Sequence, residues 1–216
     1  FGMPSDQTTT YRLINGEGDR LSGLMVDVLG QTVVVQSSAL WVELYRDIIT
    51  AAVNAGVDGR QVLWKQAESR LRQDGWKGAL DLDEGKLQDT DSDSFVLEDG
   101  VKYILNASKG QKTGFYCDQR DNKKAIRALS HGRTVYDGYC YSGGFGINAA
   151  LGGATSVLSV DSSQDAVDMT LVNAEANGIG PDRLSAVRAD AVKHMTAMTA
   201  EGRTFDLVIV DPPKLA

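Results

Sequence analysis

Four aspartates, each at the end of a short apolar run, have a spacing that suggests chemistry: Asp137, Asp161, Asp190 and Asp211. The first opens a loop of small residues that ends at Gly144, and its glycines would let backbone N–H groups approach a ligand closely. A helix after the loop would direct its partly positive N-terminus at that ligand. A carboxylate at the end of the next run suits the hydroxyls of a ribose. The pattern indicates a nucleoside-cofactor site, although an ordinary crossover with a glycine turn would give a similar loop.

The residue types in the loop discriminate between cofactors. A dinucleotide-binding loop would carry the spacing G-x-G-x-x-G, so that a pyrophosphate can sit on the helix N-terminus. The loop here reads DGYCYSGG and begins with Asp137, which would repel a pyrophosphate but could hold an ammonium group. S-adenosylmethionine carries an ammonium group on its amino-acid tail. The loop therefore favours S-adenosylmethionine, with S-adenosylhomocysteine as the product, over a nicotinamide dinucleotide.

The elements that must position these aspartates alternate between strand and helix. Apolar, β-rich runs predict strands over 134–136, 156–160, 184–187 and 205–210, and the intervening segments predict helices over 145–151, 163–177 and 191–200. Such alternation is typical of a Rossmann-like parallel sheet, in which the carboxyl ends of the strands form the ligand crevice. Four aspartates in register at those ends are harder to attribute to helix capping than one would be. The continuous run LVIV at 207–210 predicts a central, buried strand.

The first half of the chain has a different pattern. We expect one hairpin over 24–28 and 32–36, an amphipathic helix over 41–55, a strand over 62–64, an irregular segment over 70–78 and a second hairpin over 95–97 and 101–105. The sequence thus predicts an α/β protein of two domains. Residues 1–107 form a smaller, hairpin-rich α+β domain with a role in binding substrate or RNA, and residues 108–216 form the cofactor-binding domain.

Composition narrows the class of protein. The hydrophobic content is 42%, and no apolar run approaches the length that spans a membrane, so we expect a soluble protein without a membrane partner. Two cysteines, Cys117 and Cys140, argue against a disulfide framework and indicate the cytoplasm or another reducing compartment, organelles included. The two histidines, His131 and His194, lack the spacing of metal ligands, and we expect no metal site.

Charge is distributed unevenly along the chain, whose net charge is −7. The stretch 81–99 carries eight acidic residues against one lysine, whereas 102–127 carries seven basic residues against two acidic ones. A local basic patch can bind phosphates even on an acidic protein. Either segment could equally be a solvated surface. We expect a patch around Lys109 to Arg127 to face RNA and the acidic stretch to point away from it.

With these residues in view, the chain resembles the class I S-adenosylmethionine-dependent methyltransferases. More narrowly, it is similar to the large-subunit rRNA cytosine-5 methyltransferases, in which an RNA-binding PUA domain precedes a central β-rich domain and a Rossmann-like catalytic domain. Four stretches carry the resemblance, and they are YRLINGEGD at 11–19, GQKTGFYCDQR at 110–120, the loop at 137–145 and DPPK at 211–214. The stretch at 110–120 is long and specific, while the last two are shared by many methyltransferases.

The resemblance implies roles for individual residues. The loop would hold the methionine part of the cofactor, Asp161 the ribose and Asp190 the adenine amino group, with residues from 112–120 closing over the site. The implied cofactor-binding residues are Lys112, Gln119, Arg120, Asp137, Tyr139, Ser142, Gly143, Gly144, Asp161, Ser162, Asp190 and Asp211. The implied catalytic residues are Asp211, Pro212 and Pro213, an acid near cytosine N3 followed by a rigid wall against a flat base.

Two departures from the family's pattern matter. We expect the chain to begin after the PUA domain and to stop before the strand that carries the family's nucleophilic cysteine. Cysteine attack on C6 is what makes cytosine C5 able to take a methyl group. Cys117 and Cys140 are interpreted as structural, so this chain would bind cofactor without methylating RNA by itself. Its fourth strand would be an exposed apolar edge that pairs with another chain, as in a homodimer, or lowers solubility.

Other functions stay open at this point. A related guanine or small-molecule methyltransferase would share the cofactor residues, because base identity depends on residues outside them. A cofactor- or RNA-binding module without catalysis is a third hypothesis. A dinucleotide oxidoreductase is disfavoured by the loop.

Overall fold

The structure, a computed structural model, describes residues 2–57, 59–80, 95–105 and 114–212. They divide into two compact units, the first formed by 1–100 and 105–118 and the second by 101–104 and 119–216. Most of the acidic stretch, together with Lys109, Lys112 and Pro213, lies outside the described residues.

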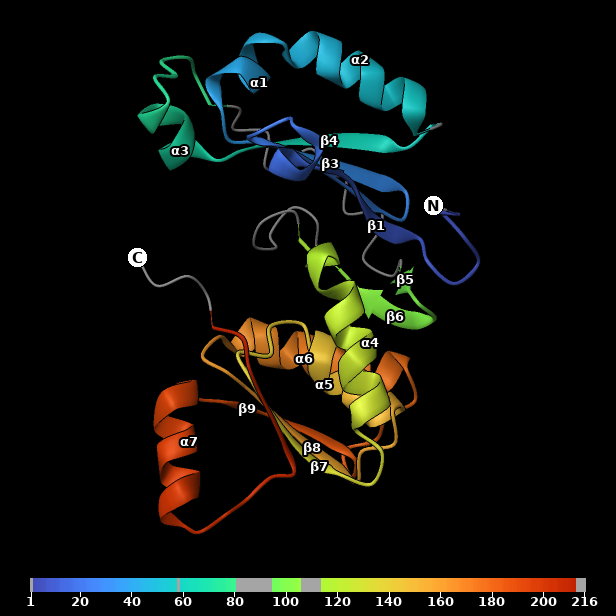
Figure 1. Cartoon of the computed structure of the whole chain (residues 1–216), viewed down its shortest axis with the longest axis vertical. Helices are drawn as coiled ribbons and strands as arrows, with labels where there is room; N and C mark the ends of the chain where they lie inside the picture. The colour runs from blue at the N-terminus through green and yellow to red at the C-terminus, as the bar shows by residue number, and fades with distance from the viewer. Residues whose placement is uncertain (1, 58, 81–94, 106–113, 213–216) are drawn as a thin grey trace. The chain divides into compact units, whose positions relative to one another are not determined.

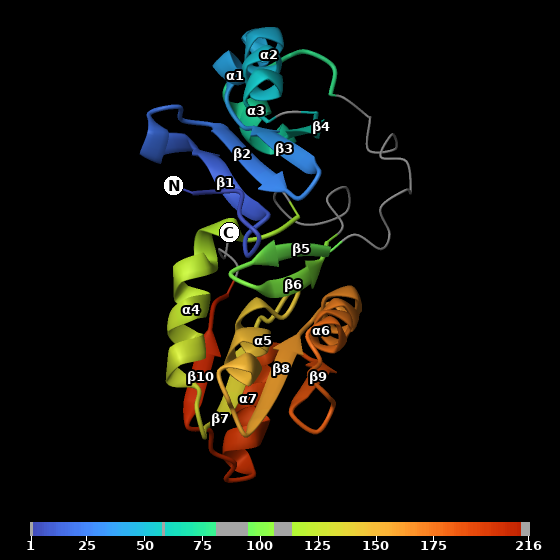
Figure 2. The same ribbon diagram turned by 90° about the vertical axis from the view of Figure 1, so that its right-hand side faces the viewer.

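The first unit is built on a four-stranded sheet in the order β1-β2-β3-β4 (Figure 2). The strands are β1 (Thr10–Asn15), β2 (Leu24–Leu29), β3 (Thr32–Ser37) and β4 (Gln61–Gln66). The antiparallel pair β2–β3 confirms the predicted first hairpin, and Gly30 turns it with a φ of +62° that favours glycine. β3 and β4 are parallel, so the chain must cross over between them.

Helices α1 (Leu40–Leu44) and α2 (Arg46–Gly56) form that crossover and cover one face of the sheet (Figure 1). Ile49 and Val53 of α2 pack against strand valines such as Val35 in the core. The prediction of one helix over 41–55 was wrong, because the backbone leaves the helical conformation at Tyr45, with φ −108° and ψ 20°. The predicted irregular segment also contains a short helix, α3 (Glu68–Gln73).

Arg12 joins the stretch at 11–19 both to β2 and to the stretch at 110–120. Arg12 on β1 donates to both carboxylate oxygens of the buried Asp27 on β2, at 2.8 and 3.1 Å. The same guanidinium lies 3.9 Å from the carboxylate of Asp118. The stretches at 11–19 and 110–120 therefore meet inside one unit. Asp118 does not cap the following helix, whose N-cap residue is Gln119.

The second predicted hairpin is also present as a two-stranded sheet of β5 (Phe95–Glu98) and β6 (Val101–Ile104). Asp99 and Gly100 turn the chain, both with positive φ. Within the second unit, β6 is held by α6 (Gln164–Ala176), because Asn173 accepts a hydrogen bond from the backbone N–H of Ile104 at 2.7 Å.

The second unit contains a parallel sheet in the order β10-β7-β8-β9 (Figure 2). Its strands are β7 (Thr134–Gly138), β8 (Ser156–Asp161), β9 (Leu184–Arg188) and β10 (Leu207–Val210). The chain moves outward from β7 through β8 to β9 and then returns to the other side of β7. This reversal beside β7 is the switch point at which such sheets bind ligands.

Helices lie on both faces of this sheet, and adjacent residues of β7 contact opposite layers. Asp137 accepts a hydrogen bond from Gly146 in α5 (Gly144–Leu151), whereas the ring of Tyr136 stacks on His194 in α7 (Ala191–Ala200). Successive strand residues point to opposite faces, so α5 and α7 cover different sides (Figure 1). Helix α4 (Arg120–Leu129) packs against α5.

β10 lies at an outer position of the described sheet, as expected for an apolar strand left at the edge, and not at the central, buried position that its apolar run by itself predicts. Among the described strands β10 pairs with β7 alone, and Val208 and Val210 are about half exposed, at 52% and 48%. Ile209 is buried against the opposite face. In the part of the chain that the structure describes, no helix is long and apolar enough to cross a membrane.

Candidate cofactor site

The carboxyl ends of the parallel strands bring the predicted aspartates to one edge. The register places Val210 and Val160 on either side of Gly138, so Asp211 and Asp161 leave their strands at the same level. Asp137 lies two residues before that level, between Ile209 and Ser159. Asp190 follows β9 by two residues, at the N-cap of α7. The predicted placement of all four aspartates at the strand ends is confirmed.

The backbone between β7 and α5 forms a tight loop over this edge. Tyr139, Tyr141 and Gly143 all have left-handed conformations, with φ of 63°, 49° and 81°. Such conformations are costly for tyrosine and persist only where surrounding contacts hold them. A Cβ on Gly143 would lie 2.8 Å from the Thr170 side chain, so the loop fits closely against α6.

Two polar residues of α6 hold the loop in place. The hydroxyl of Thr170 donates to the carbonyl of Tyr141 at 3.0 Å, and the amide of Asn173 donates to the carbonyl of Ser142 at 3.1 Å. Both side chains are buried. Sequence reasoning did not find them, although two polar residues three apart on a helix that covers a sheet are the signal that could have revealed them.

Asp161 joins the loop to the end of β8. One of its carboxylate oxygens accepts from the backbone N–H of Tyr141 and the other from that of Ser163, each at 3.0 Å. Asp161 is only partly buried, so its carboxylate keeps a surface toward solvent. Ser163 in turn caps α6, because its hydroxyl oxygen accepts from the backbone N–H of Ala166. Ser162 is exposed, and its carbonyl accepts from Arg188 at 3.2 Å.

Asp137 is completely buried beneath the start of α5. Its Oδ2 atom accepts from the backbone N–H of Gly146 at 2.9 Å and from the hydroxyl of Ser159 at 3.4 Å. A Cβ on Gly146 would lie 2.5 Å from Ser159 Oγ and 2.9 Å from Asp137 Oδ2, so only glycine allows this approach. Oδ1 is buried without a hydrogen-bond partner among the described residues.

Burial dominates the protonation of Asp137. Removal from water raises the pKa of its carboxyl group to about 7, against the opposing effect of the hydrogen bonds from Gly146 and Ser159. The negative charges of Asp161 and Asp211 raise it further. A cation beside Oδ1 would lower the pKa again, against the effects of burial and of the two neighbouring carboxylates. The contact visible in the structure is with the protein's own helix, and a direct contact with an ammonium group stays a prediction.

The remaining predicted residues are distributed around the loop. Asp190 is exposed and caps α7 by accepting from Lys193 at 3.0 Å. Asp211 and Pro212 are exposed after β10. Gln119 and Arg120 begin α4, the helix that packs on α5. Lys112 and Pro213 lie outside the described residues.

One member of the predicted basic patch does not belong to the surface. Lys123 is only 4% exposed, and its Nζ atom lies 5.5 Å from the centre of the Tyr103 ring. Consecutive residues of an α-helix point about 100° apart, so Lys123 faces α5 whereas Lys124 points outward and is exposed. Charge counting along the sequence cannot separate these two lysines.

Both cysteines are buried. Cys140 lies in the loop with its Sγ atom 3.6 Å from Thr170 Oγ1, and burial strongly raises the pKa of its thiol. Cys117 lies in the first unit, 3.7 Å from Thr10 Oγ1. A protonated, buried thiol is a poor nucleophile, which supports the structural interpretation of Cys140.

Together, a parallel sheet with a switch point, a glycine loop before a helix and a partly buried carboxylate at the next strand end indicate an α/β protein with a nucleoside-cofactor site. The model of the S-adenosylmethionine-dependent methyltransferase family matches residues 17–216. The chain belongs to this family, and its cofactor is accordingly S-adenosylmethionine.

Curated relatives place the chain more narrowly. It is 36% identical over 210 residues to ribosomal RNA large subunit methyltransferase I of Aeromonas hydrophila, covering 96% of this chain and 52% of the relative. It is 36% identical over 213 residues to the protein of the same name from Photobacterium profundum, covering 98% and 53%. The chain thus spans about half the length of the curated relatives that it matches.

Solved structures agree with the fold. An S-adenosylmethionine-dependent methyltransferase from Streptococcus mutans matches with a TM-score of 0.82 and 27% identity, over 97% of this chain and 54% of that one. A methyltransferase complexed with SAH matches with a TM-score of 0.82 and 26% identity, over 98% and 53%.

Proposed function

We propose that the protein containing this chain methylates large-subunit ribosomal RNA, at C5 of a cytosine, with S-adenosylmethionine as the methyl donor. Two findings support the proposal: membership of the methyltransferase family and the names of the curated relatives. The assignment to cytosine C5 rests on the resemblance of the stretches at 11–19 and 110–120.

The site residues fit the cofactor. The partly buried carboxylate of Asp161 suits two ribose hydroxyls, and the left-handed loop offers backbone N–H groups at the start of α5 to a carboxylate. The unpartnered Oδ1 of Asp137 suits a nearby cation. In this proposal Tyr139, Ser142, Gly143 and Gly144 shape the methionine pocket, with Ser162 beside the ribose. Asp190 takes the adenine amino group, and Lys112, Gln119 and Arg120 close the site.

The bound cofactor would supply an electrophilic methyl group on a sulfonium. The chain's own contribution is to hold that group over the carboxyl ends of β7 and β10. Asp211 leaves β10 there and would accept or donate a proton near the base, while the ring of Pro212, with Pro213 after it, restricts the backbone beside a flat substrate. Neither Cys117 nor Cys140 is assigned a catalytic role.

The proposed RNA-facing surface lies on α4 and β6. Lys102 and Lys124 are exposed and Arg127 is partly so, and all three belong to the second unit. Exposed cations of this kind neutralise phosphates and make binding sensitive to salt. Lys124→Glu should therefore weaken binding to an rRNA fragment and flatten its salt dependence. If the affinity for the rRNA fragment depends neither on salt nor on this substitution, the patch does not bind RNA.

Incubation with tritiated S-adenosylmethionine and unmodified large-subunit rRNA tests the activity. We expect incorporation by the protein that contains this chain, with the label at cytosine C5 after nucleoside digestion. Label on a guanine would establish the related guanine methyltransferase instead. Incorporation by the chain alone that Cys117→Ala or Cys140→Ala abolishes would show that the nucleophile has been misplaced.

The half-exposed outer strand β10 also supports a homodimer through that edge, which light scattering can test.

A further inference from the structure

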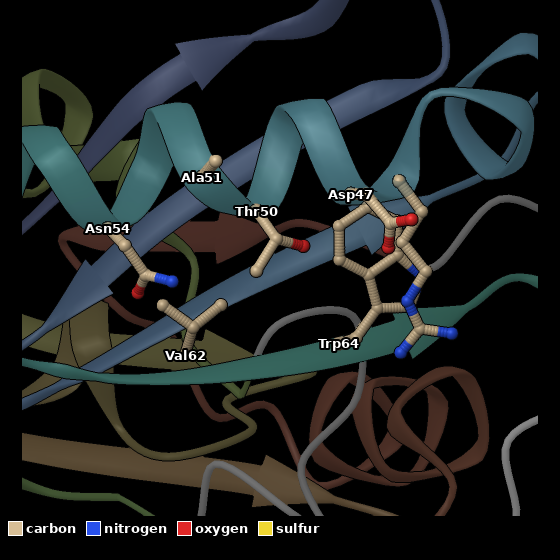
Figure 3. A pocket seen from close by; sticks show the side chains of 7 residues that line it. Asp47, Thr50, Ala51, Asn54, Val62 and Trp64 are labelled. Carbon is tan, nitrogen blue, oxygen red and sulfur yellow. The ribbon is translucent and has the colours of Figure 1, made fainter.

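A groove lies between α2 and β4 in the first unit, which contains none of the proposed catalytic aspartates. Figure 3 shows Thr50 and Asn54 pointing from the helix toward Val62 and Trp64 on the strand. The groove has a volume of about 580 Å³ and is open to solvent. This volume falls in the range of small-molecule sites.

The line of α2 residues that faces the groove is polar. Arg46, Thr50 and Asn54 recur every fourth residue and so form one line along α2. They face β4, an outer strand of its sheet, and leave Val62 and Trp64 only partly buried. Larger apolar side chains on this line would cover both residues. Thr50 is partly buried and Asn54 is exposed, so the line places polar side chains at the surface of the groove.

The Trp64 ring is held in a fixed position. Its indole N–H donates to the carboxylate of Glu43 at 3.1 Å, and Gln66 donates to the other oxygen of Glu43 at 2.6 Å. Glu43 is buried. The guanidinium of Arg46 lies 4.8 Å from the centre of the Trp64 ring. The result is a preorganised pair of flat groups, an aromatic ring and a guanidinium, at one end of the groove.

We propose that this groove binds one unpaired base of the RNA substrate. Bases splayed out of single-stranded RNA stack on aromatic rings and on arginine guanidinium planes. The amide of Asn54 offers a donor and an acceptor to a base edge, and the carboxylate of Asp47 can accept from an exocyclic amine. The inference rests on the proposed function, because it takes RNA as the substrate.

The charges of the groove indicate recognition of a base rather than of phosphates. Arg46 and Asp47 are the charged residues that line it, and their charges cancel. A neutral groove gains little from counterion release, so binding through it should depend on the presence of a base and only weakly on salt. The surface proposed on α4 should behave in the opposite way.

The test compares two RNA probes of equal length with the full-length protein, an unstructured oligomer and its abasic counterpart. Two variants alter the groove, Arg46→Ala for the stack and Asn54→Leu for the edge contact. Arg70→Ala in α3 removes an exposed arginine of the same unit as the matched control. We expect each groove variant to bind the base-containing probe about tenfold more weakly, with unchanged binding of the abasic probe. S-adenosylhomocysteine affinity should match the parent protein for both variants. The melting temperature should also match for Asn54→Leu, whose side chain is exposed, whereas Arg46→Ala loses the packing of its guanidinium on Trp64.

Each outcome has a distinct meaning. Equal weakening for both probes, or weakening equal to that of Arg70→Ala, would overturn the base site. If rRNA is methylated and the groove variants bind it like the parent, this inference fails while the proposed function stands. If the parent protein neither binds nor methylates rRNA, the proposed function fails. Ultraviolet cross-linking of the oligomer to the peptide that contains Trp64 gives a second readout, and a cross-link confined to other peptides would contradict the proposal.

Discussion

The carboxylate of Asp161 accepts a hydrogen bond from the backbone N–H of Tyr141, at 3.0 Å, across the gap between β8 and the glycine loop. Tyr141 has a left-handed conformation, with φ 49°, that would be unfavourable without such support. The residue that we expect to bind ribose is therefore also the residue that holds the methionine loop. Loop order and ribose binding should be lost together.

Asp161→Ala should weaken S-adenosylhomocysteine binding by about 1–3 kcal/mol, because it removes charged hydrogen bonds to two hydroxyls as well as the support of Tyr141. Asp161→Asn keeps an acceptor and should lose less. Calorimetry measures both, with the exposed Asp165→Ala as the control. Tighter binding of NAD than of S-adenosylhomocysteine by the parent protein would contradict the cofactor assignment.

Gly146→Ala should destabilise the protein by about 1–3 kcal/mol, since the new Cβ would collide with Ser159 Oγ and Asp137 Oδ2. Alanine is the better helix former, so any loss must come from the collision. Gly56→Ala at the end of α2 is the matched control, because its Cβ would meet nothing within 4 Å. Urea unfolding of both variants checks the prediction, and equal stability for the two would refute it.

Stability should fall with rising pH through Asp137. The pKa of its buried carboxyl is about 7 in the folded state, against an ordinary value of 3.8, so the folded state holds this proton more tightly. The contribution is complete below pH 3.8 and disappears as the pH rises to about 7. Asp137→Asn removes the titration, so the difference in unfolding free energy between variant and parent should shift by on the order of 1–4 kcal/mol over this range. A constant difference would show that Asp137 titrates normally.

Cys140 should resist thiol reagents at pH 7 to 8. Its Sγ is buried against Thr170, and burial raises the pKa of the thiol, so little thiolate forms. Labelling followed by peptide mapping should show modification of Cys140 only after denaturation. Rapid labelling in the folded state would reopen Cys140 as a candidate nucleophile.

Arg12→Met should cost about 3–5 kcal/mol, because the buried Asp27 loses the guanidinium that donates to both of its oxygens. Glu68→Gln is the control, because it removes the charge of the surface pair between Arg72 and Glu68, whose two side chains are 41% and 61% exposed. This surface pair should contribute below about 1 kcal/mol. Thermal unfolding distinguishes the two, and similar losses would contradict the importance of the buried pair.

The sequence predicts the strand–loop–helix of 134–151 closely, because glycines and a terminal aspartate mark both ends of a short apolar run. It does not predict the break at Tyr45, since the apolar periodicity of 41–55 continues across it. The inward turn of Lys123 is equally hidden, because a lysine's long aliphatic stem allows either exposure or burial. Contacts between distant elements decide these cases.

The same limit applies within the candidate site. The positions of four aspartates follow from strand ends that local patterning reveals. The burial of Asp137 does not follow, because it depends on how closely Gly146 lets α5 approach β7. To predict that Thr170 and Asn173 hold the loop, one must also know which face of α6 covers the sheet.

Helix α6 carries three contacts in one row. Thr170 and Asn173 hold the loop, and Asn177, just past its end, donates to the carbonyl of Lys102 in β6. Each residue of an α-helix is rotated by about 100° from the last. A one-residue insertion between Thr170 and Asn177 would therefore turn part of this row away from its partners. Evolutionary changes of chain length in the second unit should avoid this segment and collect in the turns at the opposite, amino-terminal edge of the sheet.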